Sequence, residues 1–358
     1  MADNPVIIPP EEVERFCVDC LKSGGAKPEH AQALAVVIVC ADHRGHFSHG
    51  LNRLPKYIKD LKKGMINTKD EPKVIKESVS TASVDGNNCL GPVVGNFSMK
   101  LAMDKAKKTG IGWVVANRSN HYGIAGWYSM KAVEEGLIGM SFTNTSPLVL
   151  PTGSKQVALG TNPISVAAPG NVKEDSIIID MATSAVALGK IEMKNRSKSR
   201  LPLGWAADAN GKVTDDPEKA LKGGLLPLGG SEETGGYKGY GLGLMVEIFC
   251  GMLSNSSFGQ NVRKWDSDEA IANLGQCFVA IDPKAFETGF TERISKLSQE
   301  MRQLPRANEN IPVLVPGDPE RMHIEKCKNL KGIPYVSVLI KSLDELGNEL
   351  KVKPLQRK

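Results

Sequence analysis

From about residue 79 onward, the chain alternates between amphipathic segments that end at a glycine and short apolar runs. Glycine is favoured just past the end of a helix, and a short apolar run between turn residues is typical of a buried strand. The pattern predicts a helix over 97–108 closed by Gly110, a strand over 111–116, a helix over 124–135 closed by Gly136 and a strand over 137–142. Helices that alternate with buried strands predict an α/β fold.

The rest of the central region continues this pattern with one interruption. Residues 177–179 form another apolar run, which predicts a strand ending at Asp180. A polar, glycine-rich stretch then runs from about residue 194 to 236, and a strongly apolar helix is predicted over 240–253. After residue 305, proline-rich turns alternate with short strands and a helix.

The first 67 or so residues are predicted to be helical. One helix begins at Pro9-Pro10, a second covers 29–41, and a third runs from Ser48, a good N-cap residue, to about Gly64. Pro55 falls early in the third helix, so that helix could also begin later and leave His49 outside it. We expect 1–78 to form a helical N-terminal segment that packs with 305–358, around a central α/β region of 79–304.

Composition excludes several classes of protein. The 358 residues carry a net charge of only +5, and the basic clusters are short and lack interleaved aromatic residues, which argues against nucleic-acid binding. No run approaches the roughly 18 apolar residues of a membrane span, and the N-terminus does not look like a targeting peptide. The seven scattered cysteines indicate free thiols, so we expect a cytoplasmic protein. Cys17 and Cys20 are interpreted as helix-face residues, and no metal site is expected.

His49 and Arg53 lie four positions apart, in the run Ser48-His49-Gly50-Leu51-Asn52-Arg53. On a helix, residues at this spacing share one face with Cβ atoms roughly 5–6 Å apart. Histidine exchanges a proton near neutral pH, and the planar guanidinium of arginine binds a carboxylate with two hydrogen bonds. Together they suit a site that holds an α-hydroxy or α-keto acid. The alternative is an ordinary surface pair on a solvated helix.

Polar turns recur where the predicted strands end. Ser119-Asn120-His121-Tyr122-Gly123, Asn144-Thr145-Ser146-Pro147, Gly160-Thr161-Asn162-Pro163 and Asp180-Met181-Ala182-Thr183-Ser184 each follow an apolar run. Ligands of open α/β sheets bind at the carboxyl ends of the strands, so the repetition indicates a ligand crevice. His121 is a candidate catalytic group there, with a turn-capping histidine as the alternative.

Lys238 lies among glycines in Gly235-Gly236-Tyr237-Lys238-Gly239-Tyr240-Gly241, at the start of the apolar helix. A helix N-terminus favours anions, so a lysine there is best explained by a bound diphosphate or carboxylate. A solvated lysine and a Schiff-base lysine are the alternatives. The chain has neither a G-x-G-x-x-G nor a G-x-x-x-x-G-K-[ST] motif, so any dinucleotide must bind by another scheme.

Seven ordered blocks resemble the type-2 malate/L-lactate dehydrogenase family, which also contains ureidoglycolate and sulfolactate enzymes and reductases of cyclic imino acids. The similarity begins at Ala41-Asp42-His43-Arg44-Gly45 and becomes looser at Pro316-Gly317-Asp318-Pro319. The blocks are Ser48-His49-Gly50 with Arg53-Leu54-Pro55, Ser119-Asn120-His121, Leu159-Gly160-Thr161-Asn162-Pro163, Asp180-Met181-Ala182-Thr183-Ser184, Gly189-Lys190-Ile191, Gly204-Trp205-Ala206 and Lys238-Gly239-Tyr240-Gly241.

The resemblance implies an NAD(P)-binding α/β fold that is not a Rossmann fold, and a homodimer. It implies that His49 or His121 exchanges the proton, and that Arg53, Ser48 and Thr161 bind the substrate. We expect the cofactor, NAD rather than NADP, to contact residues near the strand ends, the glycine-rich segment and the C-terminal block: Thr145, Asp180, Met181, Ala182, Thr183, Ser184, Ala185, Tyr237, Lys238, Gly317 and Asp318.

The expected activity is therefore the NAD(P)-dependent interconversion of a 2-hydroxy acid, of malate or L-lactate type, and its 2-keto acid. Two alternatives remain open. The substrate could be a cyclic imino acid or a sugar-derived keto acid, since the same carboxylate clamp would serve. The chain could also be a catalytically idle, cofactor-binding member of the family.

Overall fold

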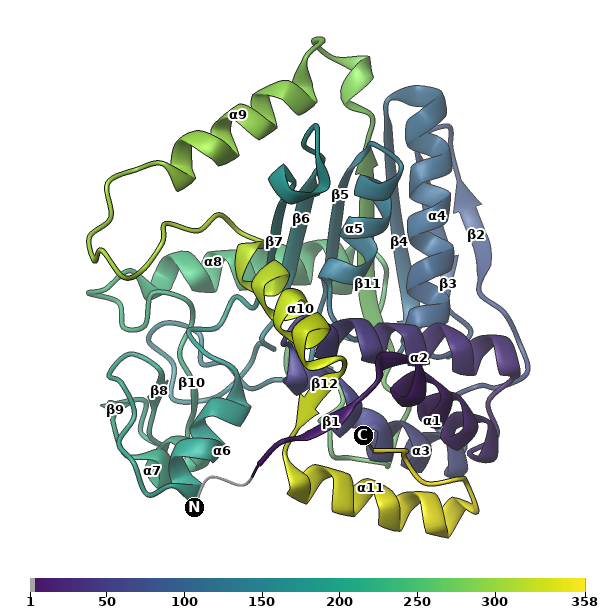
Figure 1. Cartoon of the computed structure of the whole chain (residues 1–358), viewed down its shortest axis with the longest axis vertical. Helices are drawn as coiled ribbons and strands as arrows, with labels where there is room; N and C mark the ends of the chain where they lie inside the picture. The colour runs from purple at the N-terminus through teal and green to yellow at the C-terminus, as the bar shows by residue number, and fades with distance from the viewer. Residues whose placement is uncertain (1–3, 358) are drawn as a thin grey trace.

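The computed structural model describes residues 4–357 and is built on a seven-stranded mixed sheet of order β2-β3-β4-β11-β5-β6-β7 (Figure 1). Strands β3 and β4 are parallel, and every other neighbouring pair is antiparallel. The strands are β2 (Lys73–Glu77), β3 (Thr81–Asp85), β4 (Ile111–Ser119), β5 (Ile138–Thr143), β6 (Ile164–Ala168), β7 (Ile177–Met181) and β11 (Leu274–Ile281).

These pairings give β3, β4, β5 and β7 one common direction, while β6 and β11 run the opposite way. The turns after β4, β5 and β7 therefore meet at one edge of the sheet, and the turn that leads into β6 meets them there. The polar turn at 160–163 was expected to follow a strand; it precedes β6 instead. It reaches the same edge because β6 is antiparallel to its neighbours.

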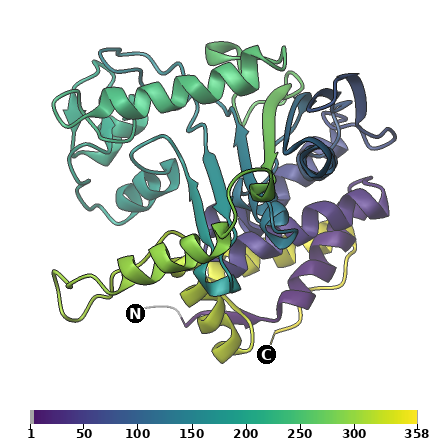
Figure 2. The same ribbon diagram turned by 90° about the horizontal axis from the view of Figure 1, so that it is seen from above.

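Helices cover both faces of the sheet (Figure 2). Helices α4 (Gly91–Thr109) and α5 (Gly126–Glu134) pack on one face through a core that includes Met99 and Tyr128. Helix α8 (Gly236–Glu247) and the π-helical turn after it, Ile248–Met252, pack on the other face through Val246 and Cys250. The predicted glycine ends are confirmed, because Gly110 and Gly136 adopt left-handed conformations with φ of 86° and 76°.

The two ends of the chain pack together. Strand β1 (Val6–Ile8) pairs with β12 (Ile333–Tyr335), and residues from both ends, including Phe16, Leu34 and Leu343, share one buried core. Replacing one of these large side chains by alanine removes roughly 2–5 kcal/mol of stability. The helices involved are α1 (Pro10–Ser23), α2 (Pro28–His43), α3 (Leu54–Lys62), α10 (Asp318–Leu330) and α11 (Ser337–Leu350). Strand β2 lies within the segment expected to be helical, so we now propose the boundary of that segment before Lys73.

The third predicted helix begins later than Ser48. Two 3₁₀ turns, η1 (Phe47–His49) and η2 (Leu51–Arg53), precede α3, which begins at Leu54 with Pro55 in its first turn. Proline lacks an N–H and is tolerated only in that first turn, so its position sets where the helix can begin. Of the two alternatives left open for this helix, the later start is therefore confirmed: His49 and Arg53 precede α3, and Ser48 does not cap it.

The glycine-rich stretch folds into a small lobe beside the main sheet. It contains a three-stranded sheet of β8 (Ala206–Ala207), β9 (Val213–Thr214) and β10 (Gly224–Leu225), with α6 (Leu188–Arg196) and α7 (Pro217–Lys222). Helix α9 (Phe290–Arg302) lies at the upper left of Figure 1, on the same side of the view as the small lobe. The short 3₁₀ turns are η3 (Lys173–Asp175), η5 (Gly259–Asn261) and η6 (Pro283–Ala285).

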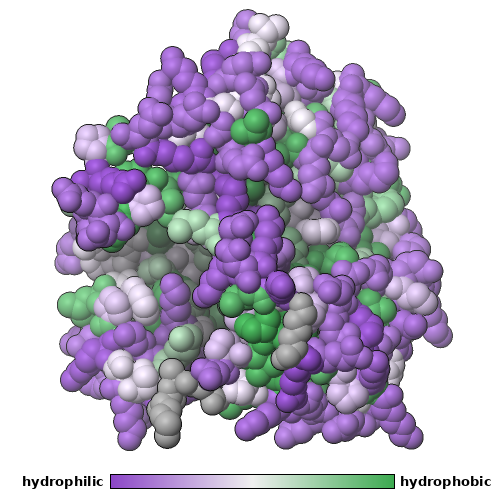
Figure 3. Space-filling view, in the orientation of Figure 1, coloured by the Kyte–Doolittle hydropathy of each residue, from purple (hydrophilic) through white to green (hydrophobic). Residues whose placement is uncertain are grey.

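Hydrophilic residues dominate the face drawn in Figure 3, which is hollowed between the segment after α9 and the small lobe. Within residues 4–357 no helix is long and apolar enough to cross a membrane. The same residues contain no cluster of three or more histidine, cysteine or acidic side chains that could hold a metal ion. All seven cysteines are free thiols.

Candidate active site

Arg53 is held by its own backbone turn. Its Nε donates a hydrogen bond of 2.6 Å to the carbonyl oxygen of Ser48. No carboxylate among the described residues lies within ion-pair distance of this guanidinium. The contact through Nε fixes the plane of the guanidinium and leaves its two terminal nitrogens for a ligand. A planar fork with two free N–H groups is the usual receptor for a carboxylate.

The turn that carries His49 is held by hydrogen bonds to the buried side chain of Asp42, in α2. The Asp42 Oδ2 accepts hydrogen bonds from the N–H of Leu51 and from the hydroxyl of Tyr335, both at 2.8 Å. Gly50 passes so close to this carboxyl that a Cβ at position 50 would lie 1.7 Å from Oδ1. Only glycine fits there, so the buried acid requires the glycine that follows His49. Burial raises the pKa of the Asp42 carboxyl to about 7.

The raised pKa predicts a pH-dependent stability. The native state keeps a proton on Asp42 up to about pH 7, whereas the unfolded chain releases it near pH ~3.9. This contribution to stability is complete below pH ~3.9 and is lost as the pH rises to about 7, by an amount on the order of a few kcal/mol. Asp42→Asn should remove that slope. Urea unfolding of both proteins at pH 5, 6, 7 and 8 measures the free energy of unfolding at each pH. If this free energy changed with pH equally in wild type and Asp42→Asn, Asp42 would be ionised throughout the range.

His121 follows β4 and has its Nδ1 occupied by two donors. The Tyr57 hydroxyl lies 2.6 Å from Nδ1, and the backbone N–H of Gly123 donates to the same atom at 3.3 Å. Because a backbone N–H can only donate, Nδ1 must accept and the ring proton must sit on Nε2. His121 is thus arranged as a neutral hydrogen-bond donor.

His49 has a different partner. Its Nδ1 lies 2.8 Å from the hydroxyl of Ser48, which can either donate or accept. The neutral and the protonated imidazole are therefore both satisfied at this atom. The ring of His49 stacks on that of His121, with centroids 5.6 Å apart and an interplanar angle of 17°. Two imidazoles with different hydrogen-bonding capacities thus lie side by side.

Burial and positive charge keep both imidazoles neutral. Burial, reinforced by Arg53, lowers the pKa of His49 to about 4. Burial and then the charges of His49 and Arg53 lower the pKa of His121 well below its ordinary range. Burial likewise raises the pKa of the Tyr57 hydroxyl, which stays protonated. A bound carboxylate would offset the charge of Arg53 and return His49 toward a useful proton affinity.

Two residues of this site were missed by the sequence analysis. Tyr57 lies one helical turn beyond Arg53, so the i, i+4 spacing was an available signal. Trp265 comes from a loop more than 200 residues away in sequence. Its ring centroid lies 4.8 Å from that of His121 and 5.3 Å from the guanidinium carbon of Arg53. No local pattern marks such a residue.

Thr161 and Thr145 meet at the strand edge, with hydroxyl oxygens 3.4 Å apart. The turns that carry them are tied to α8 by the buried carboxyl of Glu247, which accepts from the side-chain amides of Asn144 at 3.2 Å and Asn162 at 3.1 Å. Burial raises the pKa of this carboxyl. The buried acid fixes the two turns to each other, which positions both hydroxyls.

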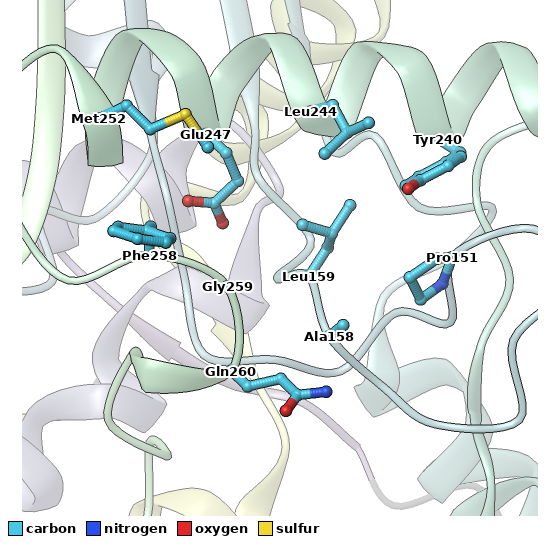
Figure 4. A pocket seen from close by; sticks show the side chains of 10 residues that line it. All are labelled: Pro151, Ala158, Leu159, Tyr240, Leu244, Glu247, Met252, Phe258, Gly259 and Gln260. Atoms are coloured by element: carbon cyan, nitrogen blue, oxygen red, sulfur yellow. The ribbon is translucent and has the colours of Figure 1, made fainter.

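A cavity of about 280 Å³ lies on the other side of Glu247, between α8 and the loops that face it (Figure 4). Its walls are mainly apolar, with Leu159, Leu244 and Phe258 among them. None of His49, Arg53 and His121 lines this cavity. It is therefore separate from the histidine–arginine site.

Polar side chains help to hold the end of β7 and the segment that follows it. The Oδ2 of Asp180 accepts the N–H of Gly126 at 2.9 Å, and burial raises the pKa of its carboxyl. The hydroxyl of Thr183 donates to the carbonyls of the 160–163 turn, and that of Ser184 donates to Val186. The backbone is also engaged in part, since Met181 pairs with Ile164 of β6 and the N–H of Ala185 donates to the carbonyl of Leu226 at 2.9 Å. The side chains of Met181, Ala182 and Ala185 make none of these hydrogen bonds.

The remaining sequence candidates lie elsewhere. Tyr237 and Lys238 are exposed in the first turn of α8, where the Lys238 ammonium lies 5.7 Å from the Tyr237 ring and forms no ion pair with any described residue. Gly317 precedes α10 with φ of 104°. The carboxylate of Asp318 is already bound by Arg302, Arg321 and the N–H of Val315. His49, Arg53 and His121 are thus brought together, whereas no contact joins Lys238 or Gly317 to them.

A neutral histidine that can take up a proton, a second histidine that donates, and an unpaired arginine fork define a site for proton exchange on a carboxylate-bearing alcohol or ketone. Residues 8–344 match the model of the family described as malate/L-lactate dehydrogenase. The chain belongs to this family. It is an NAD(P)-dependent dehydrogenase that acts on 2-hydroxy acids.

Full-length relatives support this assignment. The malate/(S)-sulfolactate dehydrogenase of Methanothermus fervidus is 40% identical over 350 residues, covering 97% of this chain and 99% of that protein. The malate dehydrogenase of Pyrococcus horikoshii is 41% identical over 357 residues, covering 99% and 98%. The solved structure of malate dehydrogenase from P. horikoshii superposes with a TM-score of 0.90 at 39% identity, covering 98% of this chain and 97% of that one.

Proposed function

We propose that the substrate is a 2-hydroxy acid of the malate or L-lactate type, bound by Arg53 with help from Ser48 and Thr161. The observation that carries this proposal is a guanidinium that has no carboxylate partner among the described residues and lies beside two neutral, stacked imidazoles. Carboxylate recognition by the arginine fork would place the C2 oxygen against the histidines. When bound, the nicotinamide supplies or accepts the hydride at C2.

We assign the acid/base role to His49. In oxidation its imidazole accepts the proton of the C2 hydroxyl, and in reduction the imidazolium returns that proton to the keto oxygen. The Ser48 hydroxyl can pair with Nδ1 of both the neutral and the protonated imidazole, so protonation of His49 places no N–H against another donor. Protonating His121 on Nδ1 would place an N–H against that of Gly123. His121 therefore acts as a hydrogen-bond donor to the oxygen through Nε2, because the N–H of Gly123 fixes its tautomer and the Tyr57 hydroxyl lies against the same Nδ1.

We propose that the cofactor is bound without a Rossmann fold, by the sequence candidates Thr145, Asp180 to Ala185, Tyr237, Lys238 and Gly317. The sheet is mixed and mostly antiparallel, unlike the two parallel halves of a Rossmann domain. Two observations fit a dinucleotide: the unpaired Lys238 at the start of α8, and the surface hollow near the small lobe (Figure 3). Asp318 would act through its turn, because its carboxylate is engaged. NAD remains our preferred cofactor over NADP.

Lys238→Ala should weaken binding of the reduced cofactor by about 10–150-fold. Loss of a charge-assisted contact costs roughly 1.5–3 kcal/mol, which corresponds to that range of affinity. Fluorescence titration of NADH and NADPH measures it, with Lys296→Ala, an exposed lysine of α9, as the control. Equal dissociation constants for wild type and Lys238→Ala would identify Lys238 as a solvated loop residue. A yellow protein bleached by borohydride would instead indicate pyridoxal phosphate on this lysine.

We also propose that the enzyme is a cytoplasmic homodimer. Free cysteines fit a reducing compartment. Helix α9 supports the dimer, because Leu297 and Met301 are 44% and 37% exposed along one stripe, which Leu304 continues at 48%. Light scattering on the purified chain should give twice the monomer mass of 38.6 kDa. A mass of one chain at micromolar concentration would refute the dimer.

The substrate class is tested by a panel of 2-keto acids and cyclic imino acids, each with NADH and NADPH, followed at about 340 nm. Turnover of oxaloacetate, pyruvate or a close analogue supports the proposal. Turnover of a cyclic imino acid alone would favour a reductase. Tight cofactor binding without turnover of any compound would favour the catalytically idle alternative.

A further inference from the structure

Trp265 lies beside Arg53 and His121, two of the residues proposed to bind the substrate. Its indole lies 4.8 Å from the His121 ring and 5.3 Å from the Arg53 guanidinium. It also meets the Tyr57 ring edge-on at 6.3 Å, with the Lys56 ammonium 5.8 Å away. One aromatic side chain thus spans the group proposed to bind the carboxylate and one proposed to bind the C2 oxygen.

The segment that carries Trp265, residues 262–273 between η5 and β11, is fastened across α3; we call it the strap. The Arg263 guanidinium pairs at 3.2 Å with Asp60, and both side chains are less than 10% exposed. The carbonyl of Arg263 accepts from the hydroxyl of Ser146 at 2.7 Å. Lys56 donates to Asp60 at 2.6 Å and to the carbonyl of Ser267 at 3.3 Å.

A second ion-pair cluster fastens the far half of the strap. Asp268 pairs with Lys59 at 3.0 Å and also with Lys63. The buried Arg263–Asp60 pair and the more exposed pairs of Asp268 together hold the strap against α3. Buried, hydrogen-bonded ion pairs hold one geometry tightly, because breaking one strands an unpaired charge. The indole is therefore a fixed wall.

A 2-keto acid is small, so its substituent at C3 must lie close to the Trp265 indole. The carboxylate carbon, C2 and C3 are consecutive atoms, so a substrate held by Arg53 and His121 places C3 within a few ångströms of both. A ring that already touches both groups restricts the space on its own side of C3. The neighbouring Lys56 ammonium and Arg263 guanidinium are both paired with Asp60, so their charges are partly neutralised beside the indole.

We propose that Trp265 is a specificity-determining residue, a wall that limits the size of the substituent at C3 of the 2-keto acid and shields the Arg53–carboxylate pair from water. This inference rests on the proposed function of the same site. It adds a residue that chooses among substrates of that class, and it makes the strap the element through which specificity can change without altering His49, Arg53 or His121.

The test compares selectivity among substrates. We would measure kcat/KM for pyruvate, oxaloacetate and phenylpyruvate in wild type, Trp265→Ala and Trp265→Phe. Trp113→Phe is the matched control, because its indole lies at the start of β4, against Phe249, with an unpartnered Nε1. One methylene in an apolar pocket changes discrimination by about 10–200-fold. Trp265→Ala should therefore raise the phenylpyruvate-to-pyruvate ratio at least about tenfold, with a smaller rise for Trp265→Phe.

Two further readouts separate this role from a structural one. The KM of Trp265→Ala for pyruvate should rise more steeply with salt than that of wild type, because the Arg53 pair becomes solvated. The dissociation constant of NADH should not change. An unchanged ratio in a folded Trp265→Phe and Trp265→Ala would overturn the proposal; if alanine unfolds the protein, an unchanged ratio in Trp265→Phe alone would do so. Absence of turnover by wild type on every compound would instead remove the proposed function.

Discussion

Arg53→Lys is expected to raise the KM for the 2-keto acid by about 10–150-fold, the equivalent of one lost charge-assisted hydrogen bond of roughly 1.5–3 kcal/mol. Lysine keeps the positive charge but cannot present two parallel N–H donors. It also lacks the Nε contact to the carbonyl of Ser48, so the orientation of the side chain is lost as well. Steady-state kinetics at saturating reduced cofactor measure the effect.

A suitable control is Arg200→Lys, because Arg200 pairs with Asp215 on the exposed surface of the small lobe. That change should leave both kinetic constants near the wild-type values. If Arg53→Lys also left KM and kcat unchanged, Arg53 would be an ordinary surface residue and the carboxylate would need another partner. A fall in kcat with unchanged KM would instead mean that Arg53 binds only the transition state.

His49→Asn is expected to lower kcat by about 10²–10⁴-fold, the usual contribution of general acid/base catalysis. Asparagine cannot exchange a proton, which lowers kcat. It can still hydrogen-bond Ser48, so the turn should keep its shape and cofactor binding should survive. His121→Asn removes a donor rather than the base and should have the smaller effect on the pH profile. If His121→Asn abolished turnover while His49→Asn left it nearly intact, the two roles would be reversed.

The pH dependence gives a second signature of His49. Its pKa of about 4 in the free enzyme means that kcat/KM for oxidation of the hydroxy acid should be flat near neutrality. It should fall as the pH drops through that value, because the protonated imidazole cannot accept the hydroxyl proton. Arg53→Gln should move this limb to higher pH, since the guanidinium charge contributes to the lowering. If the acidic limb of the kcat/KM profile stayed at the same pH in Arg53→Gln, the charge of Arg53 would not influence the pKa of His49.

Much of the central region follows from local patterns. The helix ends at Gly110 and Gly136, the strands β4 and β5 and the apolar helix α8 all lie where glycine punctuation and apolar runs predict them. These signals work because they depend on a few neighbouring residues. The polar turns also converge as expected, although the sheet that gathers them is mixed rather than parallel.

The site itself was predicted less completely, for physical reasons that can be named. The spacing of His49 and Arg53 suggested a helix, but Pro55 moves the start of α3 past both residues. The turn that carries His49 and Arg53 is held instead by the buried carboxyl of Asp42, which accepts the N–H of Leu51. A buried carboxyl at the end of a helix leaves no periodic signal in the sequence. Trp265 reaches the site only through long-range ion pairs to α3. The short strands of the small lobe carry too few residues for a recognisable alternation.

The hydrogen bond from Tyr335 to Asp42 joins residues 293 positions apart. During synthesis on a ribosome, the turn that bears His49 is therefore made long before the hydroxyl that helps to hold it. Contacts of such sequence separation form late, because the loop they close costs entropy before any contact compensates it. A nascent chain arrested before residue 335 therefore carries its histidine, its arginine and its sheet, and still lacks the final support of its catalytic turn. We therefore expect activity to appear only after Tyr335 has been made and has reached Asp42.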